Sequence, residues 1–209
     1  MGIYLYKLLW RVADIFITHL LFFYCGMRSL DVSFFTCNTL QVAQGLLGKV
    51  IEVNGLKARI VETEAYGRDA ASHAFKKTPR SSLMFDTSGH VYVYLIYGMY
   101  ECLNFTTEKV GEPGAVLIRA VEPLQGMERM KKNRKMDDVN NLCSGPGKLC
   151  RALGITRKLN GTKVGIDVKV YDDGYKVAKI RSSSRIGIKD AQDLPWRFFI
   201  EGNRFVSRT

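Results

Sequence analysis

The sequence lacks the patterns that mark most metal- and cofactor-dependent proteins. Its five cysteines, at positions 25, 37, 102, 143 and 150, are odd in number and contain no C-x-x-C pair, which argues against a disulfide framework and a zinc finger. No set of His, Cys and carboxylate residues has metal-ligand spacing, and neither a nucleophile elbow nor a dinucleotide fingerprint occurs. We therefore expect no metal, no cofactor, and reduced thiols in a cytoplasmic protein.

The stretch "SGPGKL" looks like a phosphate loop but lacks an essential residue. A Walker sequence needs a glycine five positions before Gly147, and that position holds Leu142. A nucleoside triphosphatase is thereby excluded. Backbone amides at the start of the following helix, with Lys148 beside them, could still hold a phosphate of DNA or RNA.

The chain also lacks a linker or low-complexity segment that would divide it. Its 209 residues, 46% of them hydrophobic, suffice for one good core, so we expect a single domain. Negative charge is comparatively scarce, because 31 Lys and Arg stand against 20 Asp and Glu and give a formal net charge of +11. That balance favours a polyanionic partner, either nucleic acid or an anionic membrane.

Residues 1–26 form an apolar N-terminal extension. Two basic residues precede the apolar run 15–25, so the extension superficially resembles a signal peptide or short anchor, but the run is too short to span a bilayer. It could be an amphipathic helix packed on the domain, a weak membrane anchor, or upstream sequence translated because the true start is Met27. We favour the last interpretation and assign the domain to residues 27–209.

The remaining pattern predicts an α+β fold, in which strands occur in runs rather than alternating with helices. Helical spacing of apolar residues predicts a helix over 39–47 that Gly48 ends. The dipeptide Asn54-Gly55, which suits a tight type I′ turn, predicts an antiparallel hairpin. The other expected elements are strands within "HVYVYLIY", "ECLNFTT", "GAVLIRAVEP", "TKVGIDVKVY", "YKVAKIR" and "WRFFIEGNRFVS", a basic helix opened by Pro123, and a short helix ending at Gly154.

The stretch "YVYLIYGMYECLNF", residues 92–105, concentrates aromatic rings. Tyr92 and Tyr94 alternate with apolar residues as on a half-buried strand, whereas Tyr97 and Gly98 fall where the alternation ends, as in a turn. Taken alone, such rings are more often core or interface residues than functional ones.

Two further strands carry charges in apolar surroundings. Periodicity puts Glu62, Glu64 and Tyr66 of "RIVETEAY" on one face. Ile60 shares that face, so at least one carboxylate points towards apolar or aromatic neighbours. It could pair with an arginine for structure or act as a general base in a water-poor pocket. Arg119, the only charge in the apolar part of "VLIRAVEP", should be buried beside an anion, and Glu64 is the candidate.

Together, "RIVETEAY", "SHAF" with "TPR", "VYVYLIYGMYECLNF", "VLIRAVEP" and "LCSGPGKLC" resemble the alkyladenine, or 3-methyladenine, DNA glycosylase family. The resemblance runs from about Leu30 to the C-terminus and keeps the order and spacing of the motifs. It implies a monofunctional glycosylase that flips alkylated or otherwise damaged purines out of duplex DNA and hydrolyses the N-glycosidic bond, initiating base excision repair. The implied fold is a curved, mainly antiparallel sheet with peripheral helices and a protruding aromatic β-hairpin.

The resemblance also implies a role for each motif. Glu64 would deprotonate a water aimed at C1′ of the sugar, and Arg119 would help to fix that water and the carboxylate. Tyr97, at a hairpin tip, would intercalate through the minor groove and fill the gap left by the flipped nucleotide. The implied substrate-binding groups are the rings of Tyr66, Tyr94 and His73, the amide of Ala71, the pocket-wall residue Asn104 and the backbone carbonyl of Ile186. The implied contacts with the DNA backbone are Lys77, Thr78, Met99 and Lys148.

The expected partner is therefore double-stranded DNA containing damaged purines. We expect the protein to act as a monomer with no obligate protein partner and to lie in the cytoplasm, associated with the nucleoid. No lysine matches a Schiff-base nucleophile, so hydrolysis without strand cleavage is implied. Two alternatives stay open at this point. A non-enzymatic nucleic-acid-binding module would have no use for the Glu64 and Arg119 pair, and an RNA-processing enzyme remains possible because basic and aromatic surfaces do not distinguish DNA from RNA.

Overall fold

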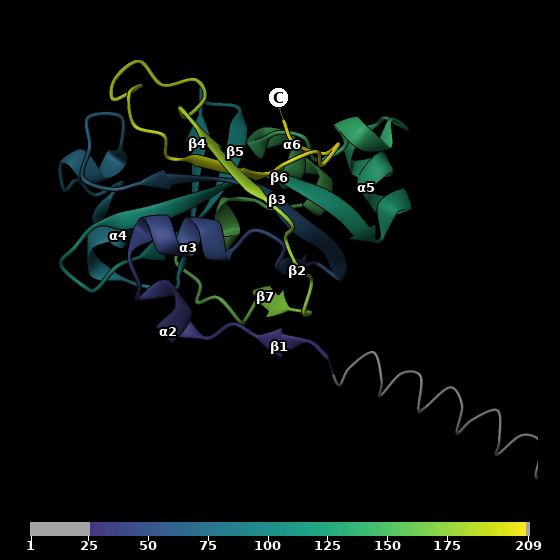
Figure 1. Ribbon diagram of the computed structural model, residues 1–209, viewed down its shortest axis with the longest axis horizontal. Helices are drawn as coiled ribbons and strands as arrows, with labels where there is room; N and C mark the ends of the chain where they lie inside the picture. The colour runs from purple at the N-terminus through teal and green to yellow at the C-terminus, as the bar shows by residue number, and fades with distance from the viewer. Residues whose placement is uncertain (1–25, 208–209) are drawn as a thin grey trace, which may run out of the picture.

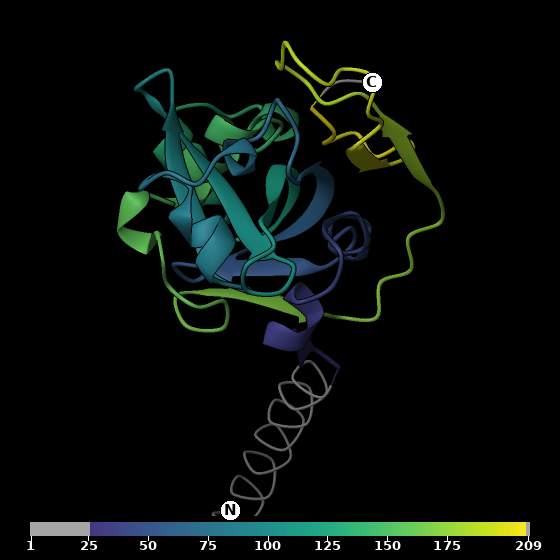
Figure 2. The ribbon, with the colours of Figure 1, turned by 90° about the vertical axis from the view of Figure 1, so that its left-hand side faces the viewer.

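The strands curl into a half-barrel with short helices around it (Figures 1 and 2). The structure, a computed structural model, describes residues 26–207. In that range the strands are β1 (Arg28–Ser29), β2 (Val50–Val53), β3 (Leu56–Tyr66), β4 (Val91–Ile96), β5 (Tyr100–Thr107), β6 (Gly114–Gln125), β7 (Val168–Asp172), β8 (Ile180–Ser183) and β9 (Arg197–Ile200). The α-helices are α2 (Val32–Phe35), α3 (Thr39–Gly45), α4 (Ser82–Asp86), α5 (Met127–Arg134) and α6 (Pro146–Leu153), and 3₁₀ turns lie at His73–Phe75, Val139–Asn141 and Arg157–Leu159.

Neighbouring strands pair in the order β1-β7-β2-β3-β6-β5-β4, and the pairs are antiparallel. One edge of β3 is shared, because β2 pairs with its first half while β9 pairs with its second half and itself pairs with β8. β3 and β6 therefore form the centre of the sheet. The predicted single-domain α+β architecture, with strands in runs and few helices, is confirmed.

The centre of the sheet is irregular where its charged residues lie. The β3–β6 register shifts on both sides of Glu62, so that Val61 and Arg119 have no residue directly opposite them. Such irregularities redirect side chains and often occur next to active sites. The regular alternation that the sequence predicts from Ile60 to Tyr66 is consequently interrupted between Ile60 and Glu62.

Two turns with left-handed backbone conformations set the pairing of adjacent strands. Asn54 and Gly55, with φ angles of 53° and 73°, join β2 to β3 as predicted. Tyr97 and Gly98, with φ angles of 53° and 70°, lie in the turn that joins β4 to β5. Positive φ at both central residues is the type I′ arrangement, whose twist suits antiparallel strands. Gly98 allows the second of these conformations without strain, which leaves the Tyr97 side chain at the turn itself.

The basic helix begins later than the sequence predicts. Pro123 does not open it but lies in β6 opposite Ala58, beside a register shift, where a strand tolerates a residue without an N–H. Helix α5 starts only after Gly126, which has a φ of 83°. A Cβ at Gly126 would lie 2.3 Å from Leu56 Cδ2, the end of a side chain that can shift, so the left-handed conformation is what favours glycine at this boundary.

The helices bury their apolar faces against the sheet. α3 packs on β3 and β6, α6 packs on β5 and β6, and α5 packs on α6. As predicted, Gly154 ends α6 in a left-handed conformation with a φ of 69°. Helix α3 ends at Gly45, slightly before the predicted boundary, and Gly48 follows with a φ of 82°. A second, smaller cluster of buried side chains surrounds Met84 and Tyr92 beneath the loop between β3 and β4.

The N-terminal extension 1–26 falls outside the described residues except for Gly26, so its three interpretations and the domain boundary stay predictions. The described chain enters the fold immediately afterwards, because β1 pairs with β7 and Leu30 is buried in the main core. Between residues 26 and 207, no helix has the length and hydrophobicity needed to cross a lipid bilayer.

Candidate active site

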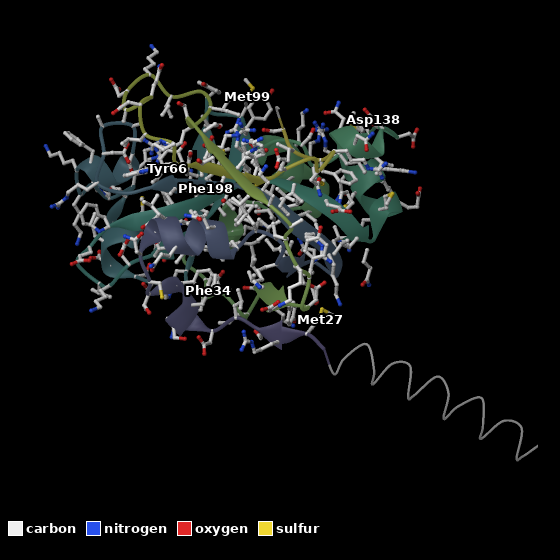
Figure 3. All side chains as sticks on the ribbon, viewed as in Figure 1. Met27, Phe34, Tyr66, Met99, Asp138 and Phe198 are labelled. Carbon is white, nitrogen blue, oxygen red and sulfur yellow. The ribbon has the colours of Figure 1, made fainter. Side chains whose placement is uncertain are left out.

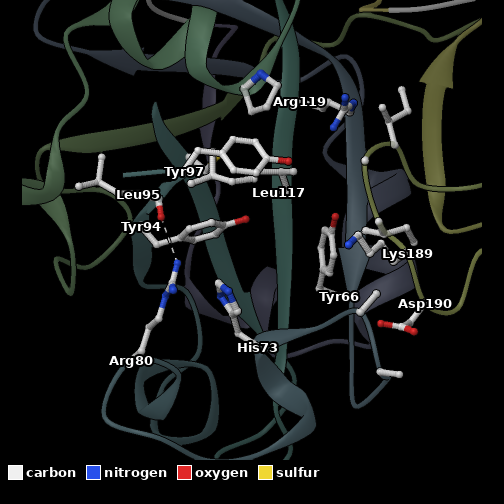
Figure 4. Close-up of a pocket in the computed structure, with 18 of the residues that line it drawn as sticks. Tyr66, His73, Arg80, Tyr94, Leu95, Tyr97, Leu117, Arg119, Lys189 and Asp190 are labelled. Carbon is white, nitrogen blue, oxygen red and sulfur yellow. Dashed lines mark hydrogen bonds between the residues drawn. The ribbon is translucent and has the colours of Figure 1, made fainter. Parts of the chain in front are cut away.

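A cleft of about 620 Å³ lies between the centre of the sheet, the β4–β5 hairpin and the loop before β9 (Figure 4). Its volume is within the range of about 300–1,000 Å³ that is typical of sites for small organic ligands. The fold brings together predicted site residues that are far apart in the sequence. Those that line the cleft are Tyr66, Ala71, His73, Tyr94, Tyr97, Arg119 and Ile186.

Glu64 lies immediately behind the wall of this cleft, and its side chain is 0% exposed. The Ile186 amide donates a hydrogen bond to Glu64 Oε1 at 2.7 Å, and the Tyr66 hydroxyl donates one to Oε2 at 2.9 Å. Arg119 Nη1 lies 3.4 Å from Oε1, as predicted for a charge within an apolar segment. These three residues all line the cleft, so the carboxylate is in direct contact with its wall.

The surroundings of Glu64 make it a stronger proton acceptor than an ordinary glutamate. Burial raises its pKa, and this effect outweighs the opposing influence of Arg119, the Ile186 amide and the Tyr66 hydroxyl. The neighbouring charge of Glu62 acts in the same direction as burial. A carboxylate with a raised pKa, held by fixed donors beside a cleft, suits the role of a general base.

A second buried carboxylate balances the charges of the site. Glu62 accepts hydrogen bonds from Arg197 Nε at 2.6 Å, from the Ser207 amide at 2.7 Å and from the Ser207 hydroxyl at 3.0 Å. Arg119 Nε lies 3.3 Å from Glu62 Oε1, so one guanidinium bridges both carboxylates. Sequence reasoning missed Arg197, because it is 135 positions from Glu62 and no local pattern connects them.

Three aromatic rings face one part of the cleft. Tyr66 from β3 and Tyr94 from β4 border the same space, and His73 lies beneath Tyr94 (Figure 4). The His73 ring meets Tyr94 edge to face at 4.7 Å, and its Nδ1 is 2.9 Å from the Tyr92 hydroxyl. Burial lowers the pKa of His73, and the charge of Arg80 lowers it further. The rings therefore present a neutral surface at neutral pH, which suits a flat aromatic ligand.

Each of the two tyrosines carries a guanidinium over its ring. Arg80 lies 5.2 Å from the centroid of Tyr94 and donates a hydrogen bond to the Leu95 carbonyl at 3.1 Å. Arg185 lies 4.7 Å from the centroid of Tyr66. Sequence reasoning assigned neither arginine to the site, although "TPR" contains Arg80 and the sequence "SRIGI" around Ile186 contains Arg185. Neither motif shows which ring the guanidinium meets.

Two predicted recognition groups are already bonded within the protein. The Ala71 amide donates to Asp69 Oδ1 at 3.0 Å, so its predicted contact with the polar atoms of a base requires that bond to be shared or exchanged. The Asn104 side-chain amide is buried and donates to the carbonyls of Tyr92 and Cys102. Asn104 also lines a small cavity of about 30 Å³ next to the cleft, as a pocket-wall residue would. The predicted role of the Ile186 carbonyl stays a prediction.

None of the four predicted DNA-backbone residues is buried, and none of them lines the cleft. Met99 is 66% exposed at the edge of the molecule (Figure 3), and Tyr97 is 77% exposed. Lys77 pairs with Asp86 at 2.5 Å, and Thr78 bonds with Ser81, so both are engaged within their own loop. The Lys148 ammonium donates to Asn141 and, at 3.3 Å, to the Ser144 hydroxyl. Their contacts with DNA stay predictions. Among residues 26–207, no three His, Cys, Asp or Glu side chains gather in a way that could hold a metal ion.

An enclosed carboxylate next to a cleft lined with neutral aromatic rings, in a basic domain, defines a site suited to chemistry on a flat heterocycle. Comparison with known proteins is consistent with that class, because the family Methylpurine-DNA glycosylase (MPG) matches residues 33–204. The chain belongs to this family.

Its relatives have the same assignment. A protein of Clostridium novyi (strain NT), named as a 3-methyladenine DNA glycosylase, is 42% identical over 200 residues, which cover 87% of this chain and 100% of the relative. Proteins with the same name from Methanocella arvoryzae and Agrobacterium fabrum are 48% and 46% identical, covering 87% and 84% of this chain and 97% and 91% of theirs. The protein is thus a DNA glycosylase for alkylated bases, an N-glycosyl hydrolase with DNA as its substrate.

Proposed function

We propose that this glycosylase rotates an alkylated purine out of duplex DNA into the cleft and cleaves its N-glycosidic bond with a water activated by Glu64. The observation that carries the proposal is the environment of Glu64, a buried carboxylate of raised pKa held by Arg119 and the Ile186 amide beside an aromatic cleft. If the Glu64 and Arg119 pair served only the fold, it would need neither the adjoining cleft nor the exposed Tyr97 that lines this cleft.

The chemical step follows from the positions of these groups. Glu64 takes a proton from the water as its oxygen forms a bond to C1′ of the sugar. The bond from C1′ to N9 of the purine breaks, and its electron pair passes to the purine. A purine alkylated at N3 or N7 carries a positive charge, so it leaves as a neutral base without needing an added proton. Arg119 fixes the carboxylate throughout, which limits the reorganisation that the step requires.

Access to Glu64 imposes one condition on this mechanism. Because the carboxylate is enclosed by Tyr66, Arg119 and Ile186, a water reaches it only if one of its hydrogen-bonded donors gives way. The Tyr66 hydroxyl is the suitable donor, since the same ring would stack on the entering base. Arrival of the base and exposure of the general base would then be a single event.

Binding of the flipped base rests on its charge and shape. A flat cationic purine is attracted to the faces of aromatic rings, and Tyr66 and Tyr94 border a common space in which it would lie. His73 would contact it in its neutral form, because the pKa of His73 is lowered. A protonated histidine there would repel the same cation. Tyr97 would occupy the gap in the DNA stack that the flipped nucleotide leaves.

The test is the substitution Glu64→Gln, assayed for release of free base from duplex DNA that carries one alkylated purine. We expect single-turnover excision to fall by at least about a hundredfold, the scale of a general base, while binding to duplex containing an abasic analogue stays nearly unchanged. Glu52→Gln provides the control, because Glu52 on β2 is a carboxylate that pairs with Lys57 on β3. Excision by Glu64→Gln within about threefold of the wild-type rate would remove Glu64 from this role.

A further inference from the structure

Arg185 is an enclosed arginine that contacts several residues next to the site. Its side chain is 0% exposed. Nη2 donates to Asp69 Oδ1 at 2.7 Å, and Nη1 donates to Asp69 Oδ2 and to the Ala65 carbonyl, each at 3.1 Å. The guanidinium also lies over two rings, 4.7 Å from the centroid of Tyr66 and 5.2 Å from that of Trp196.

These contacts connect Arg185 to residues that flank Glu64 or hold its hydrogen-bond donors. Ala65 stands between Glu64 and Tyr66 on β3, so the Arg185 bond to its carbonyl fixes the backbone from which both side chains project. The next residue along the chain, Ile186, supplies the amide that donates to Glu64 at 2.7 Å. Asp69 in turn holds the Ala71 amide at 3.0 Å. Arg185 lies over the Tyr66 ring but is not among the residues that line the cleft.

We propose that Arg185, paired with Asp69, is a positioning residue for base excision, holding the Tyr66 ring and the Ile186 amide in the arrangement that the bound base and Glu64 require. This inference rests on the proposed function of Glu64. It assigns Arg185 no contact with the substrate. Its effect passes through Tyr66 and through the adjacent amide.

The geometry requires arginine rather than any cation. A guanidinium is planar, so it can donate two parallel hydrogen bonds to a carboxylate and stack on a ring at the same time. Lysine has a single ammonium group and cannot meet the Asp69 carboxylate, the Ala65 carbonyl and the Tyr66 ring in this way. Arg185→Lys therefore keeps the charge while removing the orientation, which makes it a sharp test.

The chain contains a matched control for this substitution. Arg59 also forms two hydrogen bonds with one carboxylate, to Asp173 at 3.0 Å and 2.8 Å, and donates to the Gly48 carbonyl at 2.6 Å. It stacks on Tyr175 at 4.0 Å. Arg59 thus repeats the contacts of Arg185 towards the opposite end of β3, away from the cleft. Arg59→Lys should cost comparable stability without altering the site.

The experiment measures melting temperature and single-turnover base release from alkylated duplex DNA for the wild type, Arg185→Lys, Asp69→Asn and Arg59→Lys. We expect Arg185→Lys and Asp69→Asn to slow excision about tenfold or more, because small displacements of reacting groups have effects of that size. Arg59→Lys should stay within about twofold of the wild-type rate. If Arg185→Lys does not fold, Asp69→Asn supplies the same test, since its side-chain oxygen can still accept from the Ala71 amide.

The pH profile of excision is the readout that a purely structural role would not change. Glu64 faces Tyr66 and Glu62 from its own strand, Arg119 from β6, Tyr94 from β4, Cys102 from β5 and the Ile186 amide. Only that amide and Tyr66 are held by Arg185. A looser amide would stabilise the carboxylate less, so the acidic limb should move to higher pH in Arg185→Lys and stay in place in Arg59→Lys.

Unchanged excision and an unmoved acidic limb in Arg185→Lys would overturn the inference, as would equal slowing by Arg59→Lys. Glu64→Gln, assayed alongside, separates this failure from that of the proposed function. If Glu64→Gln excises normally, the general-base proposal fails. If Glu64→Gln is inactive while Arg185→Lys matches the wild type, only the positioning role fails.

Discussion

Replacing Tyr97 by alanine tests whether its ring contacts DNA or supports the core. Truncation of a fully buried aromatic side chain typically costs about 3–5 kcal/mol of folding free energy. Tyr97 is 77% exposed, so only about a quarter of that packing is at risk. The expected loss is about 1 kcal/mol, which lowers the melting temperature by only a few degrees. The positive φ of 53° does not alter this expectation, because alanine is strained there as tyrosine is.

The effect on excision should be much larger than the effect on folding. Stacking of an aromatic side chain on a base contributes about 1–3 kcal/mol, so loss of the Tyr97 ring from the gap should slow excision from a matched duplex about fivefold to 150-fold. A lesion opposite a mismatched base costs less to flip, so the same variant should regain part of its rate there. Single-turnover excision on both duplexes, with melting temperatures, measures this difference. Tyr175→Ala, at a ring stacked by Arg59, is the control.

The contrary result is equally specific. A drop of ten degrees or more in melting temperature, with equal loss of excision on matched and mismatched duplexes, would mean that Tyr97 supports the fold rather than the gap in the DNA. A drop of that size corresponds to about 2.5–5 kcal/mol in a domain of this size, which an exposed ring does not supply.

Two further predictions concern pH and the N-terminal segment. Excision should slow as the pH falls, because protonated Glu64 cannot accept a proton. The midpoint of this acidic limb should lie above the pKa of an ordinary glutamate, because burial raises the pKa of Glu64. A pH–rate profile with an acidic limb at or below about 4.3 would contradict this. A chain beginning at Met27 should fold and excise normally, because it retains the β1–β7 pairing and the buried Leu30; loss of stable protein in an expression and melting comparison would show that the extension packs on the domain.

The features that sequence could predict are those with local causes. Asn54-Gly55 specifies its turn through the conformations that the two residues tolerate, and Gly154 ends α6 for the same reason. Arg119 could be matched to Glu64 because a charge within an apolar strand needs a buried partner, and only few acids lie in comparable strands. In each case the physical constraint acts within a few residues or between two residues of unusual surroundings.

The features that sequence could not predict depend on which segments meet in space. Pro123 would suit the start of a helix, but it lies in β6, which pairs with β3, and the helix begins only after Gly126. Arg185 is one of 31 basic residues in the chain, and nothing near it indicates that Asp69, 116 positions away, is its partner. The register shifts beside Glu62 likewise depend on the opposing strand.

The pairing of charges at the site bears on how a basic protein could accept a cationic purine. Three arginines and three carboxylates pair in and behind the wall of the cleft, so these six charges cancel one another; they are Arg119, Arg185 and Arg197 with Glu62, Glu64 and Asp69. Arg80, Lys189 and Asp190 also line the cleft. The net charge of +11 therefore belongs to the rest of the chain, where it favours the phosphates of DNA. Without these carboxylates, the three arginines would repel a cationic purine in the cleft. If the base enters the cleft as proposed, this pairing keeps the six paired charges of a basic protein from opposing it.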